Sequence, residues 1–143
     1  MKIADRINQL KPSATLAISA KAQELRAQGK NILSLSVGEP DFPTPVHICE
    51  AAKKAIDEGF TRYTAVPGIP ELRQAAADYY NNNYCIEAAG DNVIITNGGK
   101  QGLYNAFQSL LSPGDHVLIP APYWVSYPPM VELTGAKAVI VQG

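Results

Sequence analysis

The chain has 143 residues, of which 46% are hydrophobic and 17% are charged, and its formal net charge at pH 7 is −1. This composition is that of a globular protein of about one domain. No basic run exceeds Lys53-Lys54, so charge gives no support for binding to nucleic acid or to an anionic membrane. No apolar stretch approaches the roughly 20 residues of a membrane span, and the N-terminus lacks the apolar core of a signal peptide. A cytoplasmic protein is therefore expected.

The sequence offers few residues for metal or disulfide chemistry. Cys49 and Cys85 are the only cysteines, and His47 and His116 are the only histidines. Their spacing matches neither a metal site nor a disulfide framework. We therefore expect two reduced thiols, no bound metal and no histidine-based catalytic triad.

Helical and extended patterns alternate along the chain. Amphipathic spacing and capping residues predict helices over about residues 14–28, 45–58, 70–83, 99–110 and 129–133. Alternating or β-branched runs predict short strands over residues 32–37, 93–96, 116–120 and 138–141. The alternation of helices with buried apolar strands predicts an α/β fold with a largely parallel sheet.

Residues 92–103 form the most informative stretch of the sequence, a predicted strand, glycine turn and helix in succession. A β-branched run ends at Asn97-Gly98-Gly99, and a helix with Lys100 in its first turn follows. The first amides of a helix have no intrahelical partner and carry partial positive charge. Glycine allows close approach of a ligand, and Lys100 adds a full positive charge. The junction is therefore a candidate anion site, and a phosphate is the expected anion; many strand–glycine–helix junctions, however, are only structural.

Two well-known phosphate loops are excluded at this junction. A Walker A loop requires Ser or Thr after its lysine, but Gln101 follows Lys100 here, and Ile94 occupies the position of the first glycine. A dinucleotide-binding loop requires a glycine at the position of Asn97. If the junction binds a phosphate, the phosphate belongs to another class of ligand.

With these motifs placed, the chain resembles the N-terminal part of the fold-type I aminotransferases of class I, which use pyridoxal 5′-phosphate (PLP). The similarity is greatest to the bacterial aspartate aminotransferase branch. The motifs that carry the resemblance occur in family order over the whole chain: Lys11-Pro12-Ser13-Ala14-Thr15, residues 36–45, Arg62-Tyr63-Thr64, residues 67–73, residues 96–101, Ser112-Pro113-Gly114-Asp115 and residues 122–128.

The resemblance implies a fold and a division into domains. Residues 1–45 would form an N-terminal arm and a segment of the small domain. Residues 46–143 would form the first part of the large PLP-binding domain, a three-layer αβα structure that is incomplete in this chain. The family is homodimeric, so a homodimer is also implied.

The resemblance also implies roles for particular residues. The backbone around Gly98, Gly99 and Lys100 would bind the cofactor phosphate, and Trp124 would stack on the pyridine ring and contact the substrate. Tyr63 would reach the cofactor phosphate of the neighbouring subunit; without the resemblance, a packed loop tyrosine is the simpler interpretation.

Two further residues would bind substrate. Gly38 would offer its backbone to the substrate α-carboxylate, and Lys11 would contact the distal carboxylate of a dicarboxylic substrate. The implied reaction moves an amino group between L-aspartate, or a related amino acid, and 2-oxoglutarate.

The residues that the family uses for bond making and breaking, above all the lysine that bonds the cofactor aldehyde, would lie beyond Gly143. We therefore expect no catalytic residue within these 143 residues, no activity of this chain alone, and a core too small for its hydrophobic content. Two other readings stay open: a non-catalytic phosphate-binding or assembly module, and a PLP-dependent lyase or synthase of the same fold.

Overall fold

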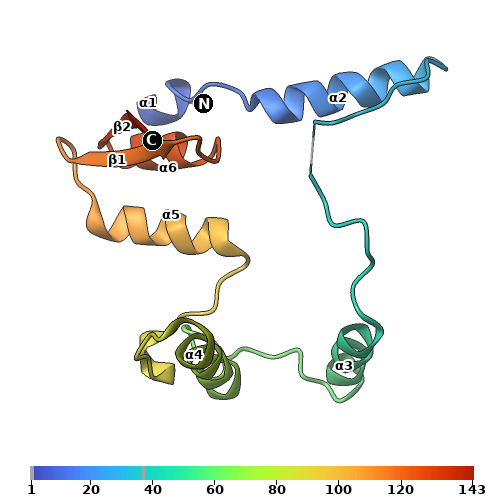
Figure 1. The fold of residues 1–143 in the computed structure, drawn as a ribbon, viewed down its shortest axis with the longest axis vertical. Helices are drawn as coiled ribbons and strands as arrows, with labels where there is room; N and C mark the ends of the chain where they lie inside the picture. Colours follow the sequence, from blue (N-terminus) through green and yellow to red (C-terminus); the bar gives the residue numbers. More distant parts are fainter. Residues whose placement is uncertain (1, 37) are drawn as a thin grey trace. The chain divides into compact units, whose positions relative to one another are not determined.

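A computed structural model describes residues 2–36 and 38–143. The chain divides into two compact units: Leu10–Arg62, and Tyr63–Gly143 together with Met1–Gln9. The smaller unit contains two helices, whereas the larger unit contains the remaining helices and a parallel pair of strands (Figure 1).

A parallel strand pair forms the ordered centre of the larger unit. β1 (His116–Ala121) pairs with β2 (Lys137–Gln142), and the register places Ile119 opposite Ile140. Parallel neighbours require a crossover connection, and α6 (Tyr127–Glu132) lies in that connection (Figure 1). The predicted parallel α/β arrangement is confirmed, and both strands extend one or two residues beyond their predicted limits.

The main hydrophobic core lies where α6 packs on this strand pair. Ile119, Val131 and Ala136 are buried together. Partly buried apolar side chains from the strands, from α5 (Gly99–Leu110) and from α6 pack around them: Phe107, Leu111, Val117, Tyr127 and Ala138. Each fully buried Val or Ile contributes about 1.5–3 kcal/mol, so this cluster stabilises the packing of α6 on the strands, and Phe107 extends the contact to α5.

α4 (Pro70–Tyr84) begins at the predicted proline and ends one residue beyond its predicted limit, so its last turn contains the asparagine run of residues 81–83. Two of these asparagines satisfy their side chains locally. Asn83 donates to the Tyr79 carbonyl at 2.8 Å, and Asn81 exchanges two hydrogen bonds of 2.8 Å with the backbone of Ala88. The C-cap of the helix is Cys85, which adopts a left-handed conformation with φ of 52°.

Two short helices of the larger unit were not predicted. α1 (Asp5–Asn8) lies near the N-terminus, and the 3₁₀ helix η1 (Gly90–Asn92) follows α4. Each spans a single turn, which is too short for a hydrophobic period to be visible in the sequence.

The prediction of a buried strand over residues 93–96 was wrong. Val93 has an extended backbone, with φ of −114° and ψ of 132°, but residues 93–96 pair with no strand among the described residues. Ile94 is 70% exposed. β-branched residues favour extended backbone, whereas a strand also requires a neighbour for its hydrogen-bond ladder. The backbone of this segment bonds to turns and loops instead: the Val93 amide donates to the Gly90 carbonyl at 3.1 Å, and the Ile95 amide donates to the Pro67 carbonyl at 2.9 Å.

The smaller unit consists of α2 (Ala14–Ala27), α3 (Val46–Asp57) and their connections. Ser13 caps α2 as predicted, because its Oγ accepts a hydrogen bond from the Leu16 amide at 3.4 Å. Pro45 is the N-cap of α3 rather than its first helical residue.

The strand predicted over residues 32–37 is also absent from the described residues, and Val37 lies outside them. Residues 32–36 attach to α2 through side chains instead. Arg26 donates twice to the Ile32 carbonyl, at 3.2 and 3.1 Å, and the Ser19 and Ser36 hydroxyl oxygens lie 3.0 Å apart. The Ile32 carbonyl and the Ser36 hydroxyl thus contact α2, whereas the apolar side chains of Leu33 and Leu35 stay exposed.

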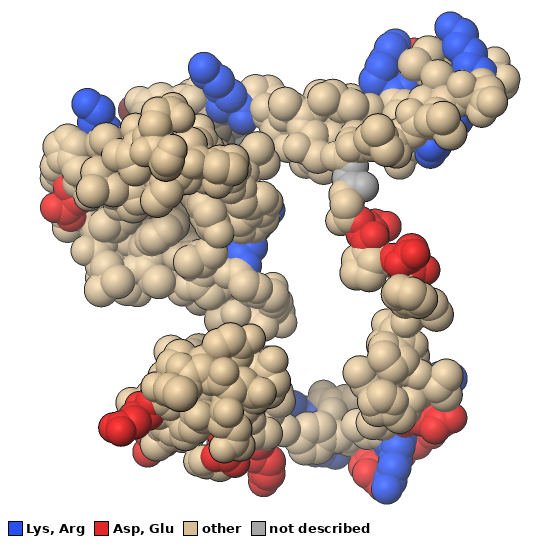
Figure 2. Space-filling view, viewed as in Figure 1, with Lys and Arg blue, Asp and Glu red and all other residues tan. Residues whose placement is uncertain are grey.

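Much apolar surface remains exposed, in agreement with the expected small core. Leu33, Leu35 and Val66 are almost fully exposed, and Val131 is the largest fully buried side chain of the described residues. Most of the face shown in Figure 2 is formed by uncharged residues, with charged side chains in small groups. No helix in the described parts of the chain combines the length and apolarity needed to cross a membrane.

Candidate functional site

The candidate site is built on the turn that leads into α5. Gly98 is the N-cap of this helix and has φ of +82°, a conformation that side chains disfavour. Its amide donates to the Thr96 carbonyl at 2.8 Å, and its own carbonyl accepts from the Thr96 hydroxyl at 3.0 Å. Thr96 therefore closes the turn from both sides and fixes the direction in which α5 begins.

Gln101 makes a second contact that holds the turn. Its Oε1 accepts a hydrogen bond from the Asn97 amide at 2.6 Å. A glutamine at the third helical position that reaches back to the chain before the helix resembles one half of a capping box. This role of Gln101 was not predicted, although its spacing from the turn was the available signal.

The first three amides of α5 are free to bind a ligand. Those of Asn97 and Gly98 are engaged within the turn, whereas those of Gly99, Lys100 and Gln101 make no hydrogen bond to any described residue. Unpartnered amides at the positive end of a helix dipole form an anion site. Cβ atoms placed on Gly98 and Gly99 would meet nothing within 4 Å, so the space beside these glycines is open.

Lys100 and Trp124, far apart in sequence, are brought together at this turn. The Lys100 Nζ lies 4.8 Å from the centroid of the Trp124 ring, within the range of a cation–π interaction. Trp124 lies between β1 and α6 and is 42% exposed, so its ring remains available for a ligand. This contact supports the predicted association of the phosphate turn with an aromatic surface.

Tyr127 orients the Trp124 ring. The two ring centroids are 5.5 Å apart and the ring planes are 88° apart, an edge-to-face contact. No role was predicted for Tyr127. Its position three residues after Trp124, at the start of a short helix, was the available signal.

An apolar groove of about 400 Å³ adjoins these rings. Side chains of α5, of β1, of the loop after β1 and of the first residue of α6 line it, and Trp124 and Tyr127 are among them. Trp124 is the residue that this groove shares with the Lys100 contact at the start of α5.

The other predicted residues lie away from this turn in sequence and in exposed positions. Tyr63 is fully exposed in the loop before α4. Lys11 is exposed just before α2, and a Cβ placed on Gly38 would meet nothing within 4 Å. Lys11 and Gly38 belong to the smaller unit, so their roles stay predictions.

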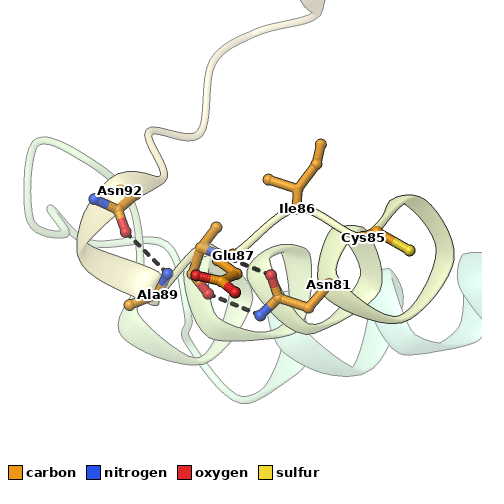
Figure 3. A pocket seen from close by; sticks show the side chains of 7 residues that line it. Asn81, Cys85, Ile86, Glu87, Ala89 and Asn92 are labelled. Atoms are coloured by element: carbon orange, nitrogen blue, oxygen red, sulfur yellow. Dashed lines mark hydrogen bonds between the residues drawn. The ribbon is translucent and has the colours of Figure 1, made fainter.

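A second depression, of about 650 Å³, lies after the end of α4 and is shown in Figure 3. Asn81 and Asn92 are held in it by hydrogen bonds to the backbone of Ala88 and Ala89. Because these polar side chains are already satisfied, they offer little to a ligand, and the depression is an irregular connection rather than a site.

The parallel strand pair with its crossover helix defines an α/β protein, and the free amides at the start of α5 give it a candidate anion site. Residues 30–142 match the family described as aminotransferase class I and II, and the chain belongs to this family. The predicted resemblance and fold class are confirmed.

Relatives with known names cover nearly the whole chain. It is 48% identical over 137 residues to the aspartate/prephenate aminotransferase of Thermus thermophilus and 47% identical over 143 residues to the aspartate aminotransferase of Bacillus subtilis. It spans 36% of the length of each.

Solved structures show the same similarity. An aspartate aminotransferase from Thermus thermophilus with maleate is 46% identical, with a TM-score of 0.95 over 99% of this chain and 37% of that chain. The aspartate aminotransferase from Rhizobium meliloti is 38% identical with a TM-score of 0.93, and the match covers 36% of that structure.

Proposed function

We propose that this chain is part of a PLP-dependent aminotransferase that moves an amino group between L-aspartate, or a related amino acid, and 2-oxoglutarate. One observation carries the proposal: the free amides of Gly99, Lys100 and Gln101 begin a helix whose lysine lies against Trp124. Family membership and the names of the relatives support it.

The residues present fit the phosphate of PLP. A dianion needs several donors converging on one point, and the free amides at the start of α5 supply them. The open space beside Gly98 and Gly99 leaves room for phosphate oxygens that a side chain would obstruct. Gly98, Gly99 and Lys100 would therefore hold the phosphate, and Trp124 would cover the ring.

When bound, PLP supplies an electron-withdrawing ring that stabilises negative charge at the substrate Cα. The chain's own contribution is binding and orientation. The free amides at the start of α5 would bind the phosphate, and the Trp124 indole would keep water from one side of the ring. An ammonium and an aromatic ring can share one indole by using its opposite faces, so the Lys100 contact is compatible with stacking.

We propose contacts to the substrate and to a partner subunit from the family resemblance and from the exposure of the residues concerned. Lys11 would bind the distal carboxylate of a dicarboxylic substrate, Gly38 would receive its α-carboxylate, and Tyr63 would reach the phosphate site of a partner subunit. Lys11 and Tyr63 are exposed, and the space beside Gly38 is open. The relative solved with maleate holds a dicarboxylate, which supports a dicarboxylic substrate here. Residues 1–45 would form an N-terminal arm and a segment of the small domain, and residues 46–143 would form the first part of the large domain.

Amino transfer is tested with the protein expressed from its native gene. With aspartate and 2-oxoglutarate, we expect oxaloacetate and glutamate to form in equal amounts, dependent on added PLP. Release of pyruvate or ammonia without glutamate would indicate a lyase of the same fold and would contradict the proposal. Absence of any PLP-dependent reaction would favour a binding or assembly role instead.

The proton transfer between substrate and cofactor requires an amine that none of the motifs in this chain provides. Lys100 belongs to the phosphate turn, where its ammonium faces Trp124. We therefore expect the isolated 143-residue chain to show no turnover and no adduct with PLP that borohydride can trap. Detection of both would contradict this assignment of Lys100.

A further inference from the structure

Arg73, in the second turn of α4, joins this helix to the chain that leads into the phosphate turn. Its Nε donates to the Val93 carbonyl at 2.9 Å, and its Nη2 lies 3.1 Å from Asp91 Oδ1. The Arg73 side chain is only 14% exposed, whereas that of Asp91 is 98% exposed. The bond to Val93 is therefore the sheltered one, and the ion pair with Asp91 is screened by water.

A second attachment holds the same segment two residues further on. The Ile95 amide donates to the Pro67 carbonyl at 2.9 Å. The Ile95 side chain also packs closely on Gly68, where an added Cβ would lie 2.8 Å from Ile95 Cγ1. Val93 and Ile95 are thus both held against residues 67–73, although they belong to no sheet in the described part of the chain.

The residues that follow transmit this placement to the phosphate turn. Thr96 comes directly after Ile95 and closes the turn through two hydrogen bonds with Gly98. The free amides of α5 begin at the next residue, Gly99. Between Val93 and Gly99 there are too few residues for the turn to be placed independently of the segment before it.

We propose that Arg73 is a positioning residue for the phosphate turn. By holding the Val93 carbonyl, its guanidinium sets where the amides of Gly99 and Lys100 meet the phosphate. This inference rests on the proposed function, because it assumes that the turn binds the phosphate of PLP. Arg73 touches neither cofactor nor substrate, so its effect falls on phosphate affinity and not on the chemistry of the ring.

The experiment compares two cofactor forms on the protein expressed from its native gene. Dissociation constants for PLP and for pyridoxal, which lacks the phosphate, are measured for the wild type and for Arg73→Met, Arg73→Lys and Asp91→Ala. The ratio of the pyridoxal constant to the PLP constant isolates the contribution of the phosphate. A general loss of stability would weaken both forms together and leave this ratio unchanged.

We expect the ratio to fall about tenfold in Arg73→Met and by less in Arg73→Lys, which keeps one donor. Asp91→Ala is the matched control: it removes the exposed ion pair but leaves the bond to Val93, so its ratio should stay within about twofold of wild type. If Arg73→Met does not fold, Arg73→Lys carries the test with the same expected direction.

An unchanged ratio in a folded Arg73 variant would overturn the inference while leaving the proposed function intact. Failure of both Arg73 variants to fold would also overturn it, because Arg73 would then serve folding alone. A wild-type ratio near one would instead overturn the phosphate site itself, and this inference with it.

Discussion

Replacing Gly68 with alanine tests how closely Ile95, in the segment before the phosphate turn, packs on Gly68. Gly68 has φ of +104°, which costs an alanine roughly 1–2 kcal/mol. The new Cβ would also lie 2.8 Å from Ile95 Cγ1 and 2.9 Å from Ile95 Cβ, a clash that no side-chain rotation removes because Cβ is fixed to the backbone. Overpacking of this kind costs about 1–3 kcal/mol, so Gly68→Ala should lose about 2–5 kcal/mol in total.

Gly114→Ala provides the matched control in the same unit. Gly114 has φ of +99°, but its Cβ would meet nothing within 4 Å, so only the backbone cost of roughly 1–2 kcal/mol applies. Urea unfolding followed by circular dichroism gives both values, and hydrogen exchange of the Ile95 amide reports the local effect. Two results together would refute the close packing of Ile95 on Gly68: a Gly68→Ala variant no less stable than Gly114→Ala, and hydrogen exchange of the Ile95 amide in Gly68→Ala at the wild-type rate.

Three further substitutions test individual contacts. Cys85→Gly should raise the free energy of unfolding by about 1 kcal/mol, because glycine adopts the left-handed conformation without strain, whereas Cys85→Ala should not raise it. Equal urea midpoints of the two variants in reducing buffer would contradict this expectation. Ser13→Ala should lose about 0.5–1 kcal/mol of stability and Ser13→Asp should retain the cap, as measured by unfolding of the helical signal. Lys100→Met should remove a contact with Trp124 worth about 0.5–1 kcal/mol and change the tryptophan emission, whereas Lys100→Arg should preserve it.

The sequence predicted those elements whose signals are local. Ser13 and Pro70 mark helix starts that the structure confirms, and β1 and β2 are apolar runs bounded by turn residues. Residues 93–96 show the limit of local signals. Their β-branched side chains gave extended backbone, but pairing in a sheet depends on a neighbour that the pattern does not specify.

The candidate site was predictable in composition but not in its contacts. The family resemblance identified both the glycine turn and Trp124. The interaction of Lys100 with Trp124 depends on how α5 packs beside β1 and α6, which is a long-range property. The positioning role of Arg73 could not be predicted from the sequence, because an arginine on an amphipathic helix is usually solvated. Its acceptors, the Val93 carbonyl and the Asp91 carboxylate, reach it only through the three-dimensional path of residues 91–95.

The most direct test of the account is a PLP titration followed by tryptophan fluorescence. Trp124 is the only tryptophan of these 143 residues, and subtracting the emission of Trp124→Phe isolates its signal in the protein expressed from its native gene. If the turn before α5 holds the cofactor phosphate beside this indole, PLP should quench the Trp124 signal saturably, and inorganic phosphate should compete. A Trp124 signal that PLP leaves unchanged, or quenching that phosphate does not affect, would contradict the assignment of this site.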